Sequence, residues 1–153
     1  MATRDGEPAQ ITIEQRVEWH DTDASGHHHH ASILRMAEVA EAELLERLGL
    51  SEELYGSFPR VHVSANFQEP LHFRARVDVH IEVAEVRRTS ITFAFVVGLE
   101  GRKVADGRVV AVRLESDGQP GPWTERQRQL LLESMPGAPA AIAVAAIAGR
   151  MVS

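Results

Sequence analysis

The chain has 153 residues, of which 44% are hydrophobic and 25% charged, and its formal net charge is −6. This length suits one globular domain with an ordinary core. The negative charge argues against nucleic-acid binding as the main task. The absence of cysteine excludes disulfides, thiolate metal sites and cysteine nucleophiles. Neither a signal peptide nor a membrane-spanning apolar segment is evident, so we expect a cytoplasmic protein without nucleic-acid or membrane partners.

The first predicted elements are a strand and a long amphipathic helix. Apolar residues alternate from Ile11 to Trp19, which predicts a strand over residues 11–19 followed by a loop over 20–28. The helix is predicted from a stripe of apolar side chains at helical spacing: Ile33, Met36, Ala37, Ala40, Leu44, Leu45 and Leu48. It should run for about 18 residues, end at a left-handed cap on Gly49 and carry charged residues such as Glu41 on its exposed side.

Four consecutive antiparallel strands are then predicted, the first three of them from alternating apolar and polar residues. These strands should cover residues 61–68, 71–83, 91–97 and 104–114. Asp106 and Gly107 are expected to form a bulge inside the last strand. The sequence GLEG predicts a hairpin turn, and a short helix should begin near Thr124.

One long helix and a sheet of about five strands predict the α+β class, in a single domain over residues 1–135. The segment 136–153 is rich in alanine and could be a helix, a packed tail or disordered. A sheet edge or face would be left uncovered in a single chain. We therefore expect a homodimer or homotetramer.

The sequence DTDASGHHHHA, residues 21–31, stands immediately before and at the start of the predicted helix. A carboxylate can act as base or nucleophile, and the free N–H groups of a helix start can bind a developing negative charge. Aspartates at this place are also common as helix caps.

The four consecutive histidines suggest a zinc site, but consecutive residues cannot all point at one ion and no HExxH motif is present. We therefore expect no metal, and the internal position of the run argues against a purification tag.

The stretch VEWHDTDASGHHHHASILRMAEVAE resembles the opening of hotdog-fold thioesterases of the 4-hydroxybenzoyl-CoA thioesterase type, including the small bacterial acyl-CoA thioesterases. The downstream stretch VSANFQEPLHFRARVDVHIEV resembles the strand, proline turn and long strand of the same family. The resemblance covers about residues 11–115 and implies a hotdog fold, with the sheet wrapped around one central helix. His29 and Ile33 depart from the aromatic residue and the tyrosine that are usual there, which bears on the shape of the acyl pocket.

The resemblance implies a cofactor-free thioesterase that hydrolyses an acyl-CoA, aroyl-CoA or acyl-carrier-protein thioester to free acid and thiol. It implies that Asp23 is the catalytic carboxylate, as nucleophile or general base, and that the thioester oxygen is bound at His30. Gly26, Asp21 and Glu38 are expected to support the loop and the oxyanion site. The sequence does not specify the acyl group.

Coenzyme A carries phosphates, for which Arg87 and Arg88 at the predicted turn 85–88 are the best basic pair. Both arginines could equally be ordinary solvated charges at a strand end, and Arg60, Arg74 and Arg76 are further candidates for binding the phosphates.

Two other functions fit the same fold: a noncatalytic acyl-thioester-binding protein, and a hotdog hydratase or dehydratase.

Overall fold

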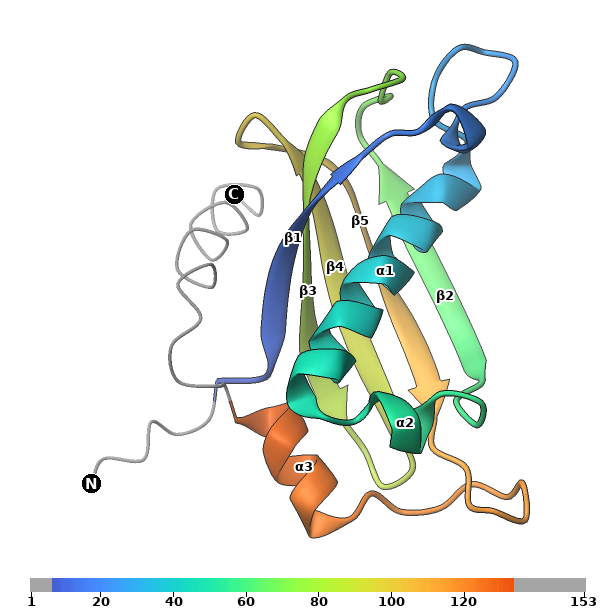
Figure 1. Cartoon of the computed structure of the whole chain (residues 1–153), viewed down its shortest axis with the longest axis vertical. Helices are drawn as coiled ribbons and strands as arrows, with labels where there is room; N and C mark the ends of the chain where they lie inside the picture. Colours follow the sequence, from blue (N-terminus) through green and yellow to red (C-terminus); the bar gives the residue numbers. More distant parts are fainter. Residues whose placement is uncertain (1–6, 134–153) are drawn as a thin grey trace.

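The structure is a computed structural model that describes residues 7–133. In this range one long helix, α1 (His30–Leu48), lies across a five-stranded antiparallel sheet (Figure 1). The strands are β1 (Gln10–Arg16), β2 (Arg60–Phe67), β3 (Arg76–Val86), β4 (Ser90–Leu99) and β5 (Arg102–Val112). Short helices complete the fold: η1 (Trp19–Asp21), α2 (Ser51–Leu54) and α3 (Glu125–Leu132). The predicted α+β class and five-stranded sheet are confirmed, whereas the predicted tail 136–153 lies outside the described residues.

The sheet order is β1-β3-β4-β5-β2, so β1 and β2 are the two edges. All members of the predicted apolar stripe on α1 are buried, and they pack with the core side chains of the sheet. The helix ends as predicted, because Gly49 adopts φ 73° and its N–H bonds back to the carbonyls of Leu45 and Glu46. Thr124 caps α3 by accepting the Gln127 N–H at 3.1 Å. No helix within residues 7–133 is long and apolar enough to span a bilayer.

Two strand predictions are wrong at their ends. The first strand stops at Arg16, and Trp19 lies on the short helix η1. The predicted strand 71–83 begins only at Arg76. Its first residues form a turn, in which the Ala75 N–H bonds to the His72 carbonyl at 3.0 Å and Arg74 takes φ 71°.

The predicted bulge at Asp106 and Gly107 is also wrong, because both residues pair in regular register with β4 and β2. The glycine has a packing role instead. A Cβ on Gly107 would lie 2.6 Å from the ring of Phe95 and would overlap the Ser64 carbonyl. Gly107 is therefore needed so that the aromatic ring of β4 can lie over the backbone of β5.

The prediction that Glu41 lies on the exposed side of the helix is wrong, because this residue is only 1% exposed. Its carboxylate pairs with the Arg60 guanidinium at the start of β2 and accepts the Tyr55 hydroxyl at 3.2 Å. Arg60 Nη1 is buried and has no hydrogen-bond partner among the described residues. Burial outweighs the attraction of Arg60 and raises the pKa of Glu41.

Candidate active site

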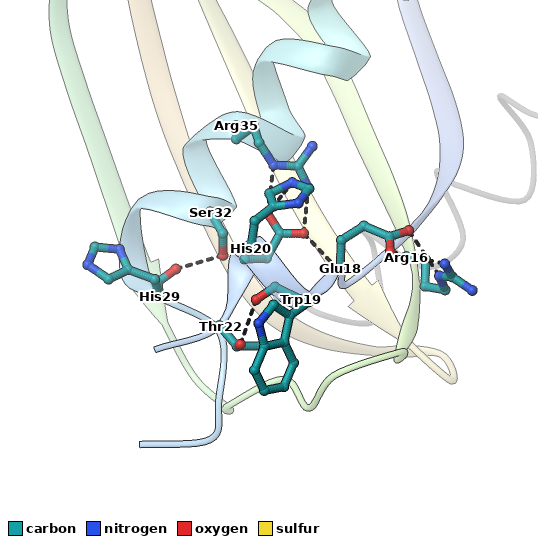
Figure 2. Close-up of polar contacts among 9 residues, drawn as sticks. Arg16, Glu18, Trp19, His20, Thr22, His29, Ser32 and Arg35 are labelled. Carbon is teal, nitrogen blue, oxygen red and sulfur yellow. Dashed lines mark hydrogen bonds and ion pairs between the residues drawn. The ribbon is translucent and has the colours of Figure 1, made fainter. Parts of the chain in front are cut away.

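The loop between β1 and α1 is anchored by the buried carboxylate of Asp21, which pairs with the Arg35 side chain labelled in Figure 2. Asp21 Oδ1 and Oδ2 accept two hydrogen bonds from Arg35 of α1, at 2.7 and 2.8 Å, and Oδ2 accepts the Glu18 N–H at 2.8 Å. Burial favours the neutral acid, but these hydrogen bonds outweigh it and lower the pKa of Asp21. The Asp21 carbonyl also accepts the His29 N–H at 2.6 Å. One residue therefore holds both ends of the loop against the start of the helix.

Asp23 opens a tight turn inside this loop. Its N–H bonds to the His27 carbonyl at 3.1 Å, and its carbonyl accepts the Gly26 N–H at 3.0 Å. Gly26 takes φ 82°, a left-handed conformation that glycine adopts without strain. These bonds close the turn over residues 23–27, and the histidine run that follows it continues into the start of α1.

The carboxylate of Asp23 is exposed and oriented by Ser25. It accepts both the Ser25 hydroxyl and the Ser25 N–H, the latter at 2.8 Å. These two hydrogen bonds, with a smaller contribution from the charges of His29 and His27, lower the pKa of Asp23. Asp23 is therefore an ionised, accessible carboxylate at neutral pH.

Of the backbone N–H groups in the first turn of α1, one has no acceptor among the described residues. His29 is the N-cap, and its Nδ1 accepts the Ala31 N–H at 3.1 Å while its carbonyl accepts the Ser32 N–H at 2.9 Å. The N–H of His29 itself is used by Asp21. Within residues 7–133, the N–H of His30 takes part in no hydrogen bond. Since terminal helix N–H groups favour negative charge, the His30 amide is a donor available to an anion.

A solvent-open hollow of about 500 Å³ lies beside the carboxylate of Asp23. Of the described residues, six line it: Trp19, Thr22, Asp23, Ala24, Gly26 and Phe73. Trp19 and Phe73 meet edge to face, with ring centroids 5.6 Å apart and planes at 84°. The side chain of His30 is exposed on α1 and does not line this hollow.

The other predicted site residues lie farther away. Glu38 is exposed on α1, about 12 Å along the helix from His30. Arg87 and Arg88 lie in the β3–β4 turn, at the opposite end of the sheet from the loop before α1 (Figure 1). The length of β3 separates them from that loop by roughly 35 Å. Within one chain, neither arginine reaches a thioester bound at Asp23.

Three of the four consecutive histidines have different partners, and the ring of the fourth, His30, lies 4.1 Å from that of His29. The ring of His27 faces that of His72 at 4.9 Å, His28 Nδ1 accepts the Leu71 N–H at 2.9 Å, and His29 caps α1. In the described part of the chain, no three His, Asp or Glu side chains are grouped so as to hold a metal ion. Through these contacts, the histidines connect the turn that contains Asp23 both to the segment before β3 and to the start of α1.

Three features of the site were not predicted. The pairing of Trp19 with Phe73 joins segments distant in sequence, so no local pattern indicates it. The cap by His29 is also unexpected, because histidine is not a preferred N-cap residue. The contact with the Ser25 N–H had a detectable signal, since an aspartate in a loop commonly accepts the backbone N–H two residues later in an Asx turn.

Comparison with known proteins adds family information to this geometry. A family model described as the thioesterase superfamily matches residues 25–105. A 1,4-dihydroxy-2-naphthoyl-CoA hydrolase of Parasynechococcus marenigrum is 31% identical over 84 residues, which are 47% of this chain and 55% of that protein.

Solved structures of similar fold include a thioesterase from Thermus thermophilus, complexed with coenzyme A and Zn. It has a TM-score of 0.70 and 27% identity, covering 83% of this chain and 94% of that chain. A 1,4-dihydroxy-2-naphthoyl-CoA thioesterase from Synechocystis has a TM-score of 0.73 and 21% identity, covering 80% of this chain and 95% of that chain. The described residues therefore have the hotdog fold.

Proposed function

The chain belongs to the thioesterase superfamily, and from this membership we propose that it hydrolyses an acyl-CoA or aroyl-CoA thioester to a free acid and the thiol. One observation carries the proposal. The loop that presents the ionised carboxylate of Asp23 is fastened to the start of α1, where the His30 N–H is left without an acceptor among residues 7–133. Thioester hydrolysis needs this combination of a base or nucleophile and an oxyanion donor.

In the proposed reaction, Asp23 removes a proton from water as the water oxygen bonds to the thioester carbon. The carbonyl oxygen becomes negatively charged and accepts the His30 N–H. Collapse of this intermediate breaks the C–S bond and releases the thiolate, which takes a proton. Direct attack by the Asp23 carboxylate would form an anhydride instead, which water would then hydrolyse to the same acid.

Asp21 and Gly26 serve this site by holding the loop in place, as their hydrogen bonds and backbone conformation suggest. The exposed position of Glu38 suits contact with a second subunit. A thioester on a carrier protein would present the same reacting group, so acyl-carrier protein stays a proposed alternative donor.

We also propose a homodimer or homotetramer. The edge strand β2 exposes three large apolar side chains, with exposed fractions of 60% for Val61, 42% for Val63 and 48% for Phe67. An unpaired edge with apolar residues favours pairing with another chain. If Arg87 and Arg88 bind the phosphates of coenzyme A, they do so from a second subunit, because within one chain they lie too far from Asp23.

The test is thiol release from a panel of acyl- and aroyl-CoA thioesters by the wild type and the variant Asp23→Asn. We expect the variant to lose about 10²–10⁴ in kcat/KM, the usual contribution of general-base catalysis. Asp117→Asn is the matched control, since Asp117 also accepts the N–H two residues later, at 2.9 Å, but lies in the exposed loop after β5. Full activity in Asp23→Asn would refute the assignment. Tight binding of the panel by the wild type without turnover would instead identify a noncatalytic binding protein.

A further inference from the structure

The hollow beside Asp23 has an aromatic wall that the proposed chemistry does not use. The indole of Trp19 is 75% exposed and Phe73 is 40% exposed. We call this edge-to-face pair the aromatic corner. Large aromatic side chains left in water are unfavourable, and a cluster of them in a concave site beside a reactive group is typical of a ligand-binding surface.

The aromatic corner is held in place although it is exposed. The Trp19 carbonyl accepts both the hydroxyl and the N–H of Thr22, at 2.7 and 3.1 Å (Figure 2). Phe73 lies in the turn before β3, which is tied to the β1 side by an Arg74 N–H bond to the Val17 carbonyl at 2.9 Å. The Arg74 guanidinium lies 5.2 Å from the centre of the Phe73 ring. Because the backbone is fixed at both positions and the rings contact each other, ligand binding has less conformational entropy to remove at this wall.

The position of Asp23 indicates which part of the substrate would contact the aromatic corner. Both line the same hollow of about 500 Å³, a size common for small-molecule sites. With the thioester carbon at Asp23, the acyl group and the pantetheine arm both begin at the reacting centre, and of these two only the acyl group can carry a ring to the aromatic corner. The adenine of coenzyme A is separated from that centre by the whole pantetheine arm and the diphosphate.

The angle between the two rings indicates the shape of the acyl group. Because the planes stand at 84°, a flat ring can stack on one of them while presenting its face or edge to the other. Aromatic pairs favour these stacked and edge-to-face arrangements. A saturated ring or chain of equal size gains the apolar contact but not the aromatic contribution.

We infer that Trp19 and Phe73 bind a flat aromatic acyl group and make the enzyme select aroyl thioesters over saturated ones. This inference rests on the proposed function, since it takes Asp23 as the point that locates the thioester. It adds two specificity-determining residues to the site.

The test separates recognition from hydrolysis by using two thioethers that cannot be hydrolysed, S-benzyl-CoA and S-cyclohexylmethyl-CoA. We expect the wild type to bind the benzyl compound about five- to tenfold more tightly. Trp19→Leu should abolish this preference, while Trp19→Phe, which keeps an aromatic face, should retain most of it. Since Trp19 is on the surface, circular dichroism should show both variants folded.

The kinetic arm compares kcat/KM for benzoyl-CoA and cyclohexanecarbonyl-CoA in the same three proteins, and the same shift in preference is expected. Equal affinity of the wild type for the two thioethers, or a preference unchanged in Trp19→Leu, would overturn the inference. Repeating the binding with S-benzylpantetheine removes the nucleotide. If the effect of Trp19→Leu then vanished, the indole would be contacting adenine and the inference would be wrong. Absence of hydrolysis with a preserved thioether preference would refute the proposed function alone.

Discussion

Replacing Arg35 by methionine tests whether the buried carboxylate of Asp21 anchors the loop between β1 and α1. The substitution keeps most of the aliphatic stem but removes two hydrogen bonds to a carboxylate whose side chain is 1% exposed. Hydrogen bonds to charged groups contribute about 1.5–3 kcal/mol each, and stranding a buried charge is more costly still. The Arg35 side chain is 38% exposed, so water can replace part of this interaction. We therefore expect a loss of about 2–3 kcal/mol in the free energy of unfolding.

The assay is urea denaturation followed by far-ultraviolet circular dichroism, with a thermal scan as a second measurement. For a chain of this size the expected loss corresponds to a fall of about 5–10 °C in Tm. Arg47→Met is the matched control, because Arg47 lies on the same helix and pairs with Glu43 at 3.2 Å on its exposed surface. Exposed pairs of this kind contribute about 0.3–0.5 kcal/mol.

The difference between wild type and Arg35→Met should also depend on pH. The pKa of Asp21 is lower in the folded protein than its ordinary value. Such a group stabilises the fold above its unfolded pKa, and the stabilisation is lost as the pH falls through the folded pKa. The difference should therefore be full at neutral pH and shrink in acid. Equal losses in Arg35→Met and Arg47→Met, or a difference that does not change with pH, would refute the reasoning.

Three further predictions concern other contacts. Ser25→Ala removes the hydroxyl that lowers the pKa of Asp23, so the acid limb of the pH profile of kcat/KM should move to higher pH; an unmoved limb would contradict this. Gly107→Ala should lower the free energy of unfolding in urea by about 1–3 kcal/mol, because the methyl group overlaps a ring of β4; wild-type stability would contradict it. Arg60→Met should cost about 3 kcal/mol by stranding Glu41, and the double variant Glu41→Met/Arg60→Met should regain most of it. A double-mutant cycle in urea measures that coupling, and additive losses would contradict it.

The helix and most of the sheet could be predicted because their signals are local. The apolar stripe of α1 repeats at helical spacing for its full length, and Gly49 marks its end. The strand β4 alternates over most of its length, and the tight GLEG turn joins it to β5. In these segments local pattern and tertiary packing favour the same conformation.

The errors lie where distant contacts override the local pattern. Residues 71–75 alternate as a strand would, yet His72 pairs with His27 and Arg74 bonds to Val17, which bends the segment into a turn. Glu41 occupies the flank of α1 that faces Arg60, so a charged residue is buried where periodicity indicated solvent. Neither partner could be identified from spacing alone.

The candidate site likewise has some features that the sequence could indicate and others that it could not. The turn from Asp23 to Gly26 and the helix start at His30 are consecutive in sequence, and a motif could indicate them. The aromatic corner depends on the loop after β1 meeting the turn before β3, which only the folded chain brings together. The lack of an acceptor for the His30 amide within residues 7–133 is likewise seen only in the folded chain, where the neighbouring amides of His29, Ala31 and Ser32 all have acceptors.

The central claim is that the Asp23 carboxylate and the His30 amide act on one thioester carbonyl. The most direct measurement is a crystal structure with an aroyl-CoA ketone analogue, in which a methylene group replaces the thioester sulfur. We predict the ketone oxygen about 2.7–3.1 Å from the His30 nitrogen, and Asp23 within about 3–3.5 Å of the carbonyl carbon or of a water beside it. A ketone bound with its carbonyl away from both groups would contradict the claim.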